Sequence, residues 1–258
     1  MPMPTFLRNL IHRLDEKKRA LFPVPRDPTV EADLNVLLEE SDLLTGGRRM
    51  VSIQTLQKTT SFSKKQLQTL YRGMKNECPS GYIDKETFMD ILGEFYPLGD
   101  AEKYASHVFR TFKPDDRGRV CFQQLIETLS MLMYDPEGEG RLFWLFTLYD
   151  VDNDGLITLY EVEEIVESVY DLIQHYVPHH NDTSPRERAY EVYKKLIDAC
   201  ADDTSGGELG MTMMTSGDGR CHQVDGQCLT WELFRAACRN NPQIVNSLDA
   251  FNTVIPVH

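Results

Sequence analysis

The chain has 258 residues, and its 27 Lys and Arg against 40 Asp and Glu give a formal net charge of −13. This length can bury one large core or two small ones, and the negative charge argues against nucleic-acid binding through a general basic surface. The six cysteines follow no spacing typical of secreted proteins and the first residues contain no apolar signal core, so we expect a reduced, cytoplasmic protein.

The N-terminal segment is basic on an otherwise acidic chain. Residues 1–26 carry six Lys or Arg and two acidic residues, a balance of 6 − 2 = +4, and residues 6–14 place apolar and basic side chains at the spacing of an amphipathic helix. Such a helix suits contact with an anionic membrane through residues 6–22, docking in the protein's own groove, or a frayed, solvated end. Pro2 stands where N-myristoylation requires glycine. We interpret residues 1–61 as a regulatory extension.

An internal repeat begins after this extension. Gly81, Gly118 and Gly155 lie 37 residues apart, and each is followed two residues later by Ile or Val. This period predicts helix-loop-helix units, with a fourth copy ending at Glu232. The fold class is therefore expected to be all-α, with four EF-hand units in two lobes, residues 62–136 and 137–258, and short paired strands in the loops.

The third unit contains residues 150–161, DVDNDGLITLYE, which match a calcium-binding EF-hand loop. Glycine at the sixth position permits the sharp turn that wraps the chain around an ion. A bidentate glutamate at the last position favours Ca²⁺ over Mg²⁺, and the alternative is a chance acidic turn. The expected ligands are three carboxylates, one carbonyl, one water-mediated hydroxyl and the bidentate carboxylate: Asp150, Asp152, Asp154, Leu156, Thr158 and Glu161.

The first two loops lack a full ligand set. The same register places Asn76, Cys78, Ser80 and Thr87 at the ligand positions of the first loop and Lys113, Asp115, Arg117 and Gln124 at those of the second. Because carboxylates are missing and cations replace some of them, we expect both units to be structural.

The fourth unit begins with a capping box at Ser184 and Glu187, which predicts a helix running to Asp198. A loop from Asp198 to Glu232 spans 232 − 198 = 34 residues, 23 more than the 11 of an ordinary loop, and residues 203–224 form the inserted run. The interpretations are a second, weaker calcium site, a partner-docking or regulatory excursion, and a zinc site. The candidate calcium ligands are Asp198, Asp202, Asp225 and Glu232, and the candidate zinc ligands are Cys200, Cys221, His222 and Cys228.

Several segments resemble the neuronal calcium sensor family. They are residues 61–81 with the Cys78-Pro79-x-Gly81 signature of a disabled first hand, and residues 142–150, 183–186 and 244–251. The chain is similar in particular to the potassium-channel-interacting protein (KChIP) branch, over most of residues 50–254. Its second loop, split fourth loop and N-terminal segment differ from the family pattern and mark it as a divergent member.

The resemblance implies a two-lobed helical fold whose apolar groove receives the N-terminal helix of a Shal-type voltage-gated potassium channel. We expect a calcium-binding auxiliary modulator of these A-type channels, held by its partner at the cytosolic face of the plasma membrane. The alternatives are a regulatory subunit of an enzyme such as a phosphatase and a calcium-responsive transcriptional regulator. No catalytic motif is present, so we expect no enzymatic activity. Side chains expected to line the core or the partner groove are Leu70, Phe109, Phe112, Leu125, Leu129, Leu132 and Phe146, with Leu145 and Val166.

Overall fold

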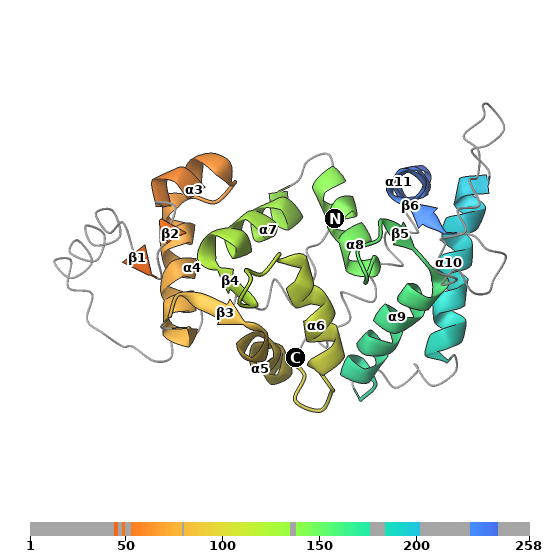
Figure 1. Ribbon diagram of the computed structural model, residues 1–258, viewed down its shortest axis with the longest axis horizontal. Helices are drawn as coiled ribbons and strands as arrows, with labels where there is room; N and C mark the ends of the chain where they lie inside the picture. The colour runs from red at the N-terminus through yellow and green to blue at the C-terminus, as the bar shows by residue number, and fades with distance from the viewer. Residues whose placement is uncertain are drawn as a thin grey trace. The chain divides into compact units, whose positions relative to one another are not determined.

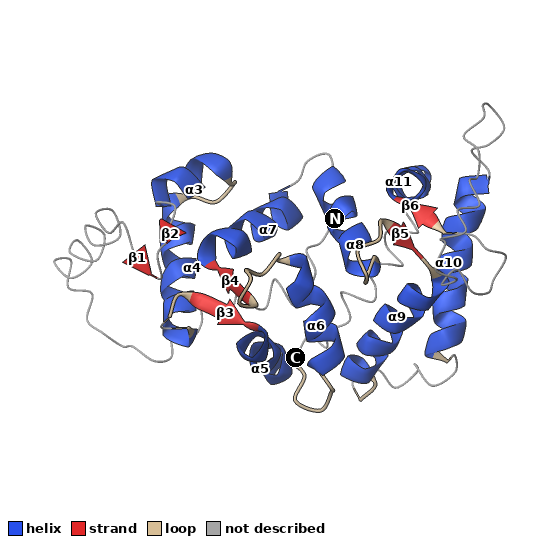
Figure 2. Cartoon of the chain, viewed as in Figure 1, coloured by secondary structure: helices blue, strands red, loops and turns tan. Residues whose placement is uncertain are grey.

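The computed structural model describes residues 44–45, 48–49, 53–78, 80–134, 138–175, 184–201 and 228–241. Within these ranges the chain forms nine helices and six strands of two or three residues (Figures 1 and 2). The predicted all-α class is confirmed. The predicted N-terminal helix, the run 203–224 and the segment 244–251 lie outside the described residues.

The chain divides into two compact units, of which the first comprises residues 1–95 and 112–136. Its helices are α3 (Ile53–Thr59), α4 (Lys64–Glu77), α5 (Lys85–Phe95) and α7 (Phe122–Tyr134), and its strands are β1 (Leu44–Thr45), β2 (Arg48–Arg49), β3 (Tyr82–Asp84) and β4 (Arg119–Cys121). β1 pairs with β2 and β3 with β4, both antiparallel, and α3 packs against α4 and α7 (Figure 1).

Helix α4 begins where its sequence provides a capping box. Ser63 Oγ accepts a hydrogen bond from Gln66 N at 3.4 Å, and Ser63 N donates to Gln66 Oε1 at 2.9 Å, which satisfies two backbone donors at the helix start. The amphipathic pattern of α4 then buries Leu67 and Met74. In the loop pair that follows, Arg119 of β4 lies 4.3 Å from the ring centroid of Tyr82 of β3.

The second unit comprises residues 96–111 and 137–258. Its helices are α6 (Glu102–Thr111), α8 (Glu139–Tyr149), α9 (Leu159–Ile173), α10 (Pro185–Ala201) and α11 (Trp231–Asn240), and its strands are β5 (Leu156–Ile157) and β6 (Leu229–Thr230), which pair antiparallel. Helix α8 is buried on nearly all sides because it contacts α6, α9 and α11. The predicted start of α10 is confirmed, since Ser184 N donates to Glu187 Oε2 at 2.9 Å and Glu187 N donates back to Ser184 Oγ at 3.2 Å.

Helix α6 groups with the second unit, whereas the predicted lobe 62–136 included it. Asp100 N donates to the carbonyl of Asp171 at 3.1 Å, and Lys103 Nζ lies 2.8 Å from Asp171 Oδ2. At the other end of α6, Trp144 Nε1 donates to Thr111 Oγ1 at 2.9 Å. These contacts with α8 and α9 join α6 to the helices of the third loop.

The repeated glycines confirm the predicted turns. Gly81, Gly118 and Gly155 have φ angles of 78°, 69° and 85°, in the left-handed region that favours glycine, and each stands directly before a strand. Helices precede and follow each turn, so the period of 37 residues in the sequence corresponds to a repeated helix-loop-helix arrangement.

Candidate metal centre

Three aspartates meet in the loop between α8 and α9. Each of Asp150, Asp152 and Asp154 offers one carboxylate oxygen, and these oxygens lie within 4.8 Å of one another. Asp150 is buried, whereas Asp152 and Asp154 are exposed. The sequence therefore predicted correctly that these three side chains converge, and their arrangement can hold a metal ion.

The backbone of the loop holds the aspartates in place. Asp150 ends helix α8, and its N–H donates to the carbonyl of Phe146 at 2.8 Å. The chain then turns through Asn153 and Gly155, whose φ angles are 58° and 85°. One oxygen of each aspartate accepts a backbone hydrogen bond: Asp150 Oδ2 from Gly155 N at 3.2 Å, Asp152 Oδ1 from Asp154 N at 3.2 Å, and Asp154 Oδ1 from Leu156 N at 2.8 Å.

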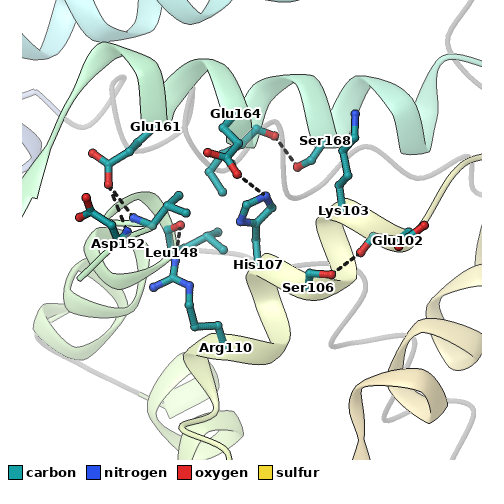
Figure 3. Close-up of polar contacts among 12 residues, drawn as sticks. Glu102, Lys103, Ser106, His107, Arg110, Leu148, Asp152, Glu161, Glu164 and Ser168 are labelled. Atoms are coloured by element: carbon teal, nitrogen blue, oxygen red, sulfur yellow. Dashed lines mark hydrogen bonds and ion pairs between the residues drawn. The ribbon is translucent and has the colours of Figure 1, made fainter. Parts of the chain in front are cut away.

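Glu161 joins the end of the loop to its beginning. Its Oε2 accepts hydrogen bonds from Thr158 N and Thr158 Oγ1, both at 2.8 Å, in the capping box that starts α9. Its Oε1 accepts from Val151 N at 2.8 Å, and Figure 3 shows this carboxylate directed toward the Asp152 backbone. Both oxygens are therefore hydrogen-bonded to donors of the loop, and Glu161 is not in the group of carboxylates whose oxygens lie within 4.8 Å of one another. A bidentate contact with an ion would use the lone pairs that these hydrogen bonds leave free.

The surroundings of two carboxyl groups of the loop disfavour their ionised forms. Burial raises the pKa of Asp150, a hydrogen bond from Gly155 opposes this, and the charges of Asp154 and Asp152 raise the pKa further. Burial also raises the pKa of Glu161, against the lowering effect of its hydrogen bonds. A bound cation would stabilise the ionised form of both groups.

One buried carboxylate oxygen of the loop has no hydrogen-bond partner among the residues that the structure describes. This atom is Asp150 Oδ1. An unpaired buried carboxylate oxygen is costly, and a cation beside the exposed Asp152 and Asp154 carboxylates would satisfy it. The residues present therefore fit a hard divalent cation, since every donor is oxygen. The remaining predicted ligands, Leu156 in β5 and Thr158 before α9, follow in the same loop.

In the second loop, the carboxylate of Asp115 is already bound by groups of the protein. Asp115 Oδ1 accepts from the backbone N–H groups of Arg117 and Arg119 at 3.0 and 2.9 Å, and Asp115 Oδ2 lies 3.0 Å from Arg119 Nη2. The hydrogen bond from Arg119 lowers the pKa of Asp115. Gln124 Nε2 donates to the carbonyl of Lys113 at 2.5 Å. A guanidinium thus lies beside the carboxylate at the third position of this loop.

The first loop is closed by its own backbone. The carbonyl of Cys78 accepts from Gly81 N at 2.8 Å, and Ser80 Oγ donates to the carbonyl of Tyr82 at 3.2 Å. Cys78 is buried, Ser80 is exposed and Thr87 is half-buried. The side chain of Asn76 lies outside the described residues.

Strand pairing places the fourth loop one residue away from the register predicted from the sequence. Ile157 pairs with Leu229, as Ile83 pairs with Val120 in the first unit. Thr158 and Thr230 then cap the following helices in the same way, each accepting a hydrogen bond from the residue three positions later. The residue three after Thr158 is Glu161, whereas the residue three after Thr230 is Leu233.

Glu232 is therefore one position out of register with Glu161, and its side chain is exposed. Asp198 is also exposed, near the end of α10, and Asp202 and Asp225 lie outside the described residues. Of the candidate zinc ligands, Cys200 and Cys228 are described and half-buried, while Cys221 and His222 lie outside the described ranges. Cys200 Sγ contacts the carbonyl of Leu233 at 3.5 Å.

The predicted groove residues are buried in the two units. Each of the seven predicted groove side chains is at most 5% exposed, and the two further side chains, Leu145 and Val166, are fully buried. The first unit contains Leu70, Phe112, Leu125, Leu129 and Leu132, and the second contains Phe109 and Phe146. An incoming helix would reach these side chains only after the part of the structure that covers them moved. More accessible apolar surface surrounds Phe143, which is 46% exposed and packs edge-on against Trp231 at a ring-centroid distance of 5.3 Å.

Sequence reasoning missed Arg110, which contacts the loop from helix α6. Its position matches no motif, and only the packing of α6 beside α8 and α9 brings it to the site.

No family model matches the chain. Among the helices of the described ranges, none is both long and apolar enough to cross a membrane.

Proposed function

We propose that the chain is a non-enzymatic calcium-binding regulatory protein whose EF-hand site is the loop 150–161. The observation that carries this proposal is Asp150 Oδ1, a buried carboxylate oxygen with no described partner that stands beside two exposed carboxylates. Such an arrangement is unfavourable alone and is relieved by a divalent cation.

Calcium is the cation that this donor set suits best. Aspartates at the first, third and fifth positions, a carbonyl at the seventh, a water held by Thr158 at the ninth and a bidentate carboxylate at the twelfth form the seven-oxygen shell of a calcium loop. Magnesium prefers six close ligands in a rigid octahedron, and zinc sites usually include His or Cys, neither of which occurs between residues 150 and 161.

Glu161 links the site to helix α9. It lies in the first turn of α9, whose buried face carries Val162, Ile165 and Val166. Coordination of an ion by Glu161 would therefore act directly on the first turn of α9. Movement of the exiting helix is how sensor EF-hands reshape their apolar surface.

The test is calcium titration by isothermal calorimetry of the wild type and of Glu161→Gln. We expect the wild type to bind with a dissociation constant of about 10⁻⁷ to 10⁻⁵ M and the variant to bind at least about tenfold more weakly. Asp116→Asn, an exposed carboxylate of the second loop, is the matched control and should bind like the wild type. Unchanged binding by Glu161→Gln would refute the site.

As partner we propose a helical segment of a membrane channel, with the protein acting as an auxiliary modulator of A-type (Shal) potassium channels at the cytosolic face of the plasma membrane. Support comes from the resemblance of residues 61–81 and 142–150 to the potassium-channel-interacting branch. The aromatic side chains of α8 and α11 add partly exposed apolar surface, of the kind that accepts an amphipathic helix.

Calorimetry with a synthetic peptide of a Shal-type channel N-terminus tests this partner. We expect micromolar or tighter binding, of about −8 kcal/mol or more favourable. A scrambled peptide of the same composition is the control. Equal affinity for both peptides would contradict the channel assignment and favour an enzyme or another helix as the target.

A further inference from the structure

Arg110 reaches the candidate metal loop from a different helix. Its Nη1 donates to the carbonyl of Asp150 at 2.8 Å and to Asn153 Oδ1 at 3.1 Å. Its Nη2 donates to the carbonyl of Leu148 at 3.2 Å, the contact that Figure 3 shows. One planar guanidinium therefore holds the last turn of α8 and the first half of the loop together. A single ammonium could not reproduce this set of contacts, because they require a fork of donors.

The contacted groups are those that set the position of Asp150. The Asp150 carbonyl belongs to the same residue as the unpaired Oδ1, and Asn153 has the left-handed φ of 58° that turns the loop back toward the aspartates. A displacement of Arg110 would release both. Conversely, a change in the loop alters the acceptors on which Arg110 depends.

The guanidinium also lies in the electric field of the loop. Burial disfavours its charge, and the carboxylates of Asp150, Glu161, Glu164 and Asp152 favour it. A divalent cation in the loop would interact with the same carboxylates. Two positive groups that share one set of negative charges oppose each other, so a stabilising coupling between the ion and Arg110 must come from the ordered acceptors of the loop and not from the shared charges.

Further contacts on the same face of α6 extend this link along α9. His107 Nε2 lies 3.6 Å from Glu164 Oε1, and Lys103 Nζ lies 2.8 Å from Asp171 Oδ2. Figure 3 shows Lys103, His107 and Arg110 on the turns of α6 that run beside α9. Residues at this spacing share one helix face. Helix α6 ends at Thr111, directly before the chain enters the second loop.

We propose that Arg110 is a positioning residue that couples calcium binding in the loop 150–161 to the stability of helix α6. This inference rests on the proposed function, because it requires that loop to bind calcium. It adds a specific set of contacts through which an ion in the third loop would stabilise α6, the helix that precedes the second loop.

The test is hydrogen-deuterium exchange followed by mass spectrometry on the full chain, with calcium and with a chelator. In the wild type, calcium orders the carbonyls that accept from Arg110, so we expect α6 amides to exchange about tenfold more slowly when calcium is present. In Arg110→Met the loop should still respond to calcium, while the change in α6 falls to less than about twofold. Loss of calcium binding in an Arg110→Met variant that circular dichroism shows to be folded would contradict this expectation, because Arg110 would then be needed to form the site itself.

Two further variants complete the design. Arg110→Lys keeps the charge but not the fork of donors, and should also lose most of the α6 response; it replaces Arg110→Met if that variant fails to fold. Lys103→Met removes the exposed ion pair at the other end of α6 and should retain the full response. An α6 response equal to that of the wild type in either Arg110 variant would overturn the inference. If calcium protects neither the loop nor α6 in the wild type, the proposed function itself fails.

Discussion

Replacing Asp150 by Asn should have opposite effects on stability with and without calcium. Without the ion, Asp150 is a buried carboxylate whose oxygen lies within 4.8 Å of those of Asp152 and Asp154. Coulomb's law gives about 0.9 kcal/mol of repulsion for each pair at this distance in a water-like dielectric, or about 1.7 kcal/mol for the two. The neighbouring Arg110 guanidinium offsets part of this, so we expect Asp150→Asn to stabilise the calcium-free protein by about 1 kcal/mol.

With calcium the sign reverses. An ion at 100 times its dissociation constant stabilises the wild type by about 2.7 kcal/mol, and the variant loses most of this contribution. For a domain of this size each kcal/mol shifts the melting temperature by about 2–4 °C. Thermal denaturation followed by circular dichroism, in chelator and in excess calcium, therefore compares the two proteins directly.

Asp116→Asn is the control for the loss of one negative charge, because this carboxylate is exposed on the second loop. It should change the melting temperature by the same small amount in both conditions. A variant Asp150→Asn that melts below the wild type in chelator would show that the carboxylate is a structural cap. Equal calcium stabilisation of both proteins would show that Asp150 is not a ligand.

Three further predictions concern pH and the two units. Because the pKa of Asp150 is raised on folding, the native state keeps the proton of this carboxyl group to a higher pH than the unfolded state does. The calcium-free wild type should therefore lose stability relative to Asp150→Asn as the pH rises above about 4. Thermal melts in chelator at several pH values measure this, and the absence of such a trend would contradict the reasoning. Arg119→Met should lower the melting temperature equally with and without calcium, because Arg119 pairs with Asp115 in the second loop; a drop that calcium reverses would contradict this. Gly99→Ala should destabilise the second unit by about 1–3 kcal/mol in urea denaturation, because the new Cβ would lie 1.9 Å from the Leu172 carbonyl oxygen, and wild-type stability would show that this contact is easily relieved.

Local features of the sequence were sufficient to predict the helix-loop-helix repeat and the convergence of three aspartates in its third loop. The period of Gly81, Gly118 and Gly155 reflects a backbone turn that each unit requires, and the capping box at Ser184 fixes the start of α10 through contacts within one turn. The convergence of the three aspartates follows in the same way, since a single short loop brings them together.

Features that depend on packing between distant segments were not predictable. Glu232 was expected to close the fourth loop, but the pairing of Leu229 with Ile157, 229 − 157 = 72 residues away, places Leu233 in register with Glu161. The contact of Arg110 with Asp150 similarly depends on where α6 packs. Periodicity predicts which face of a helix is apolar, but not whether another helix already covers that face, and the predicted groove residues are accordingly found buried.

The most direct test is a crystal structure grown in excess calcium, with anomalous diffraction data to locate the ions. We predict one strong peak in the second unit, at about 2.3–2.6 Å from oxygens of Asp150, Asp152, Asp154 and Glu161. An empty loop under these conditions, or an ion bound beside Asp198 and Glu232 instead, would contradict the assignment of the metal centre.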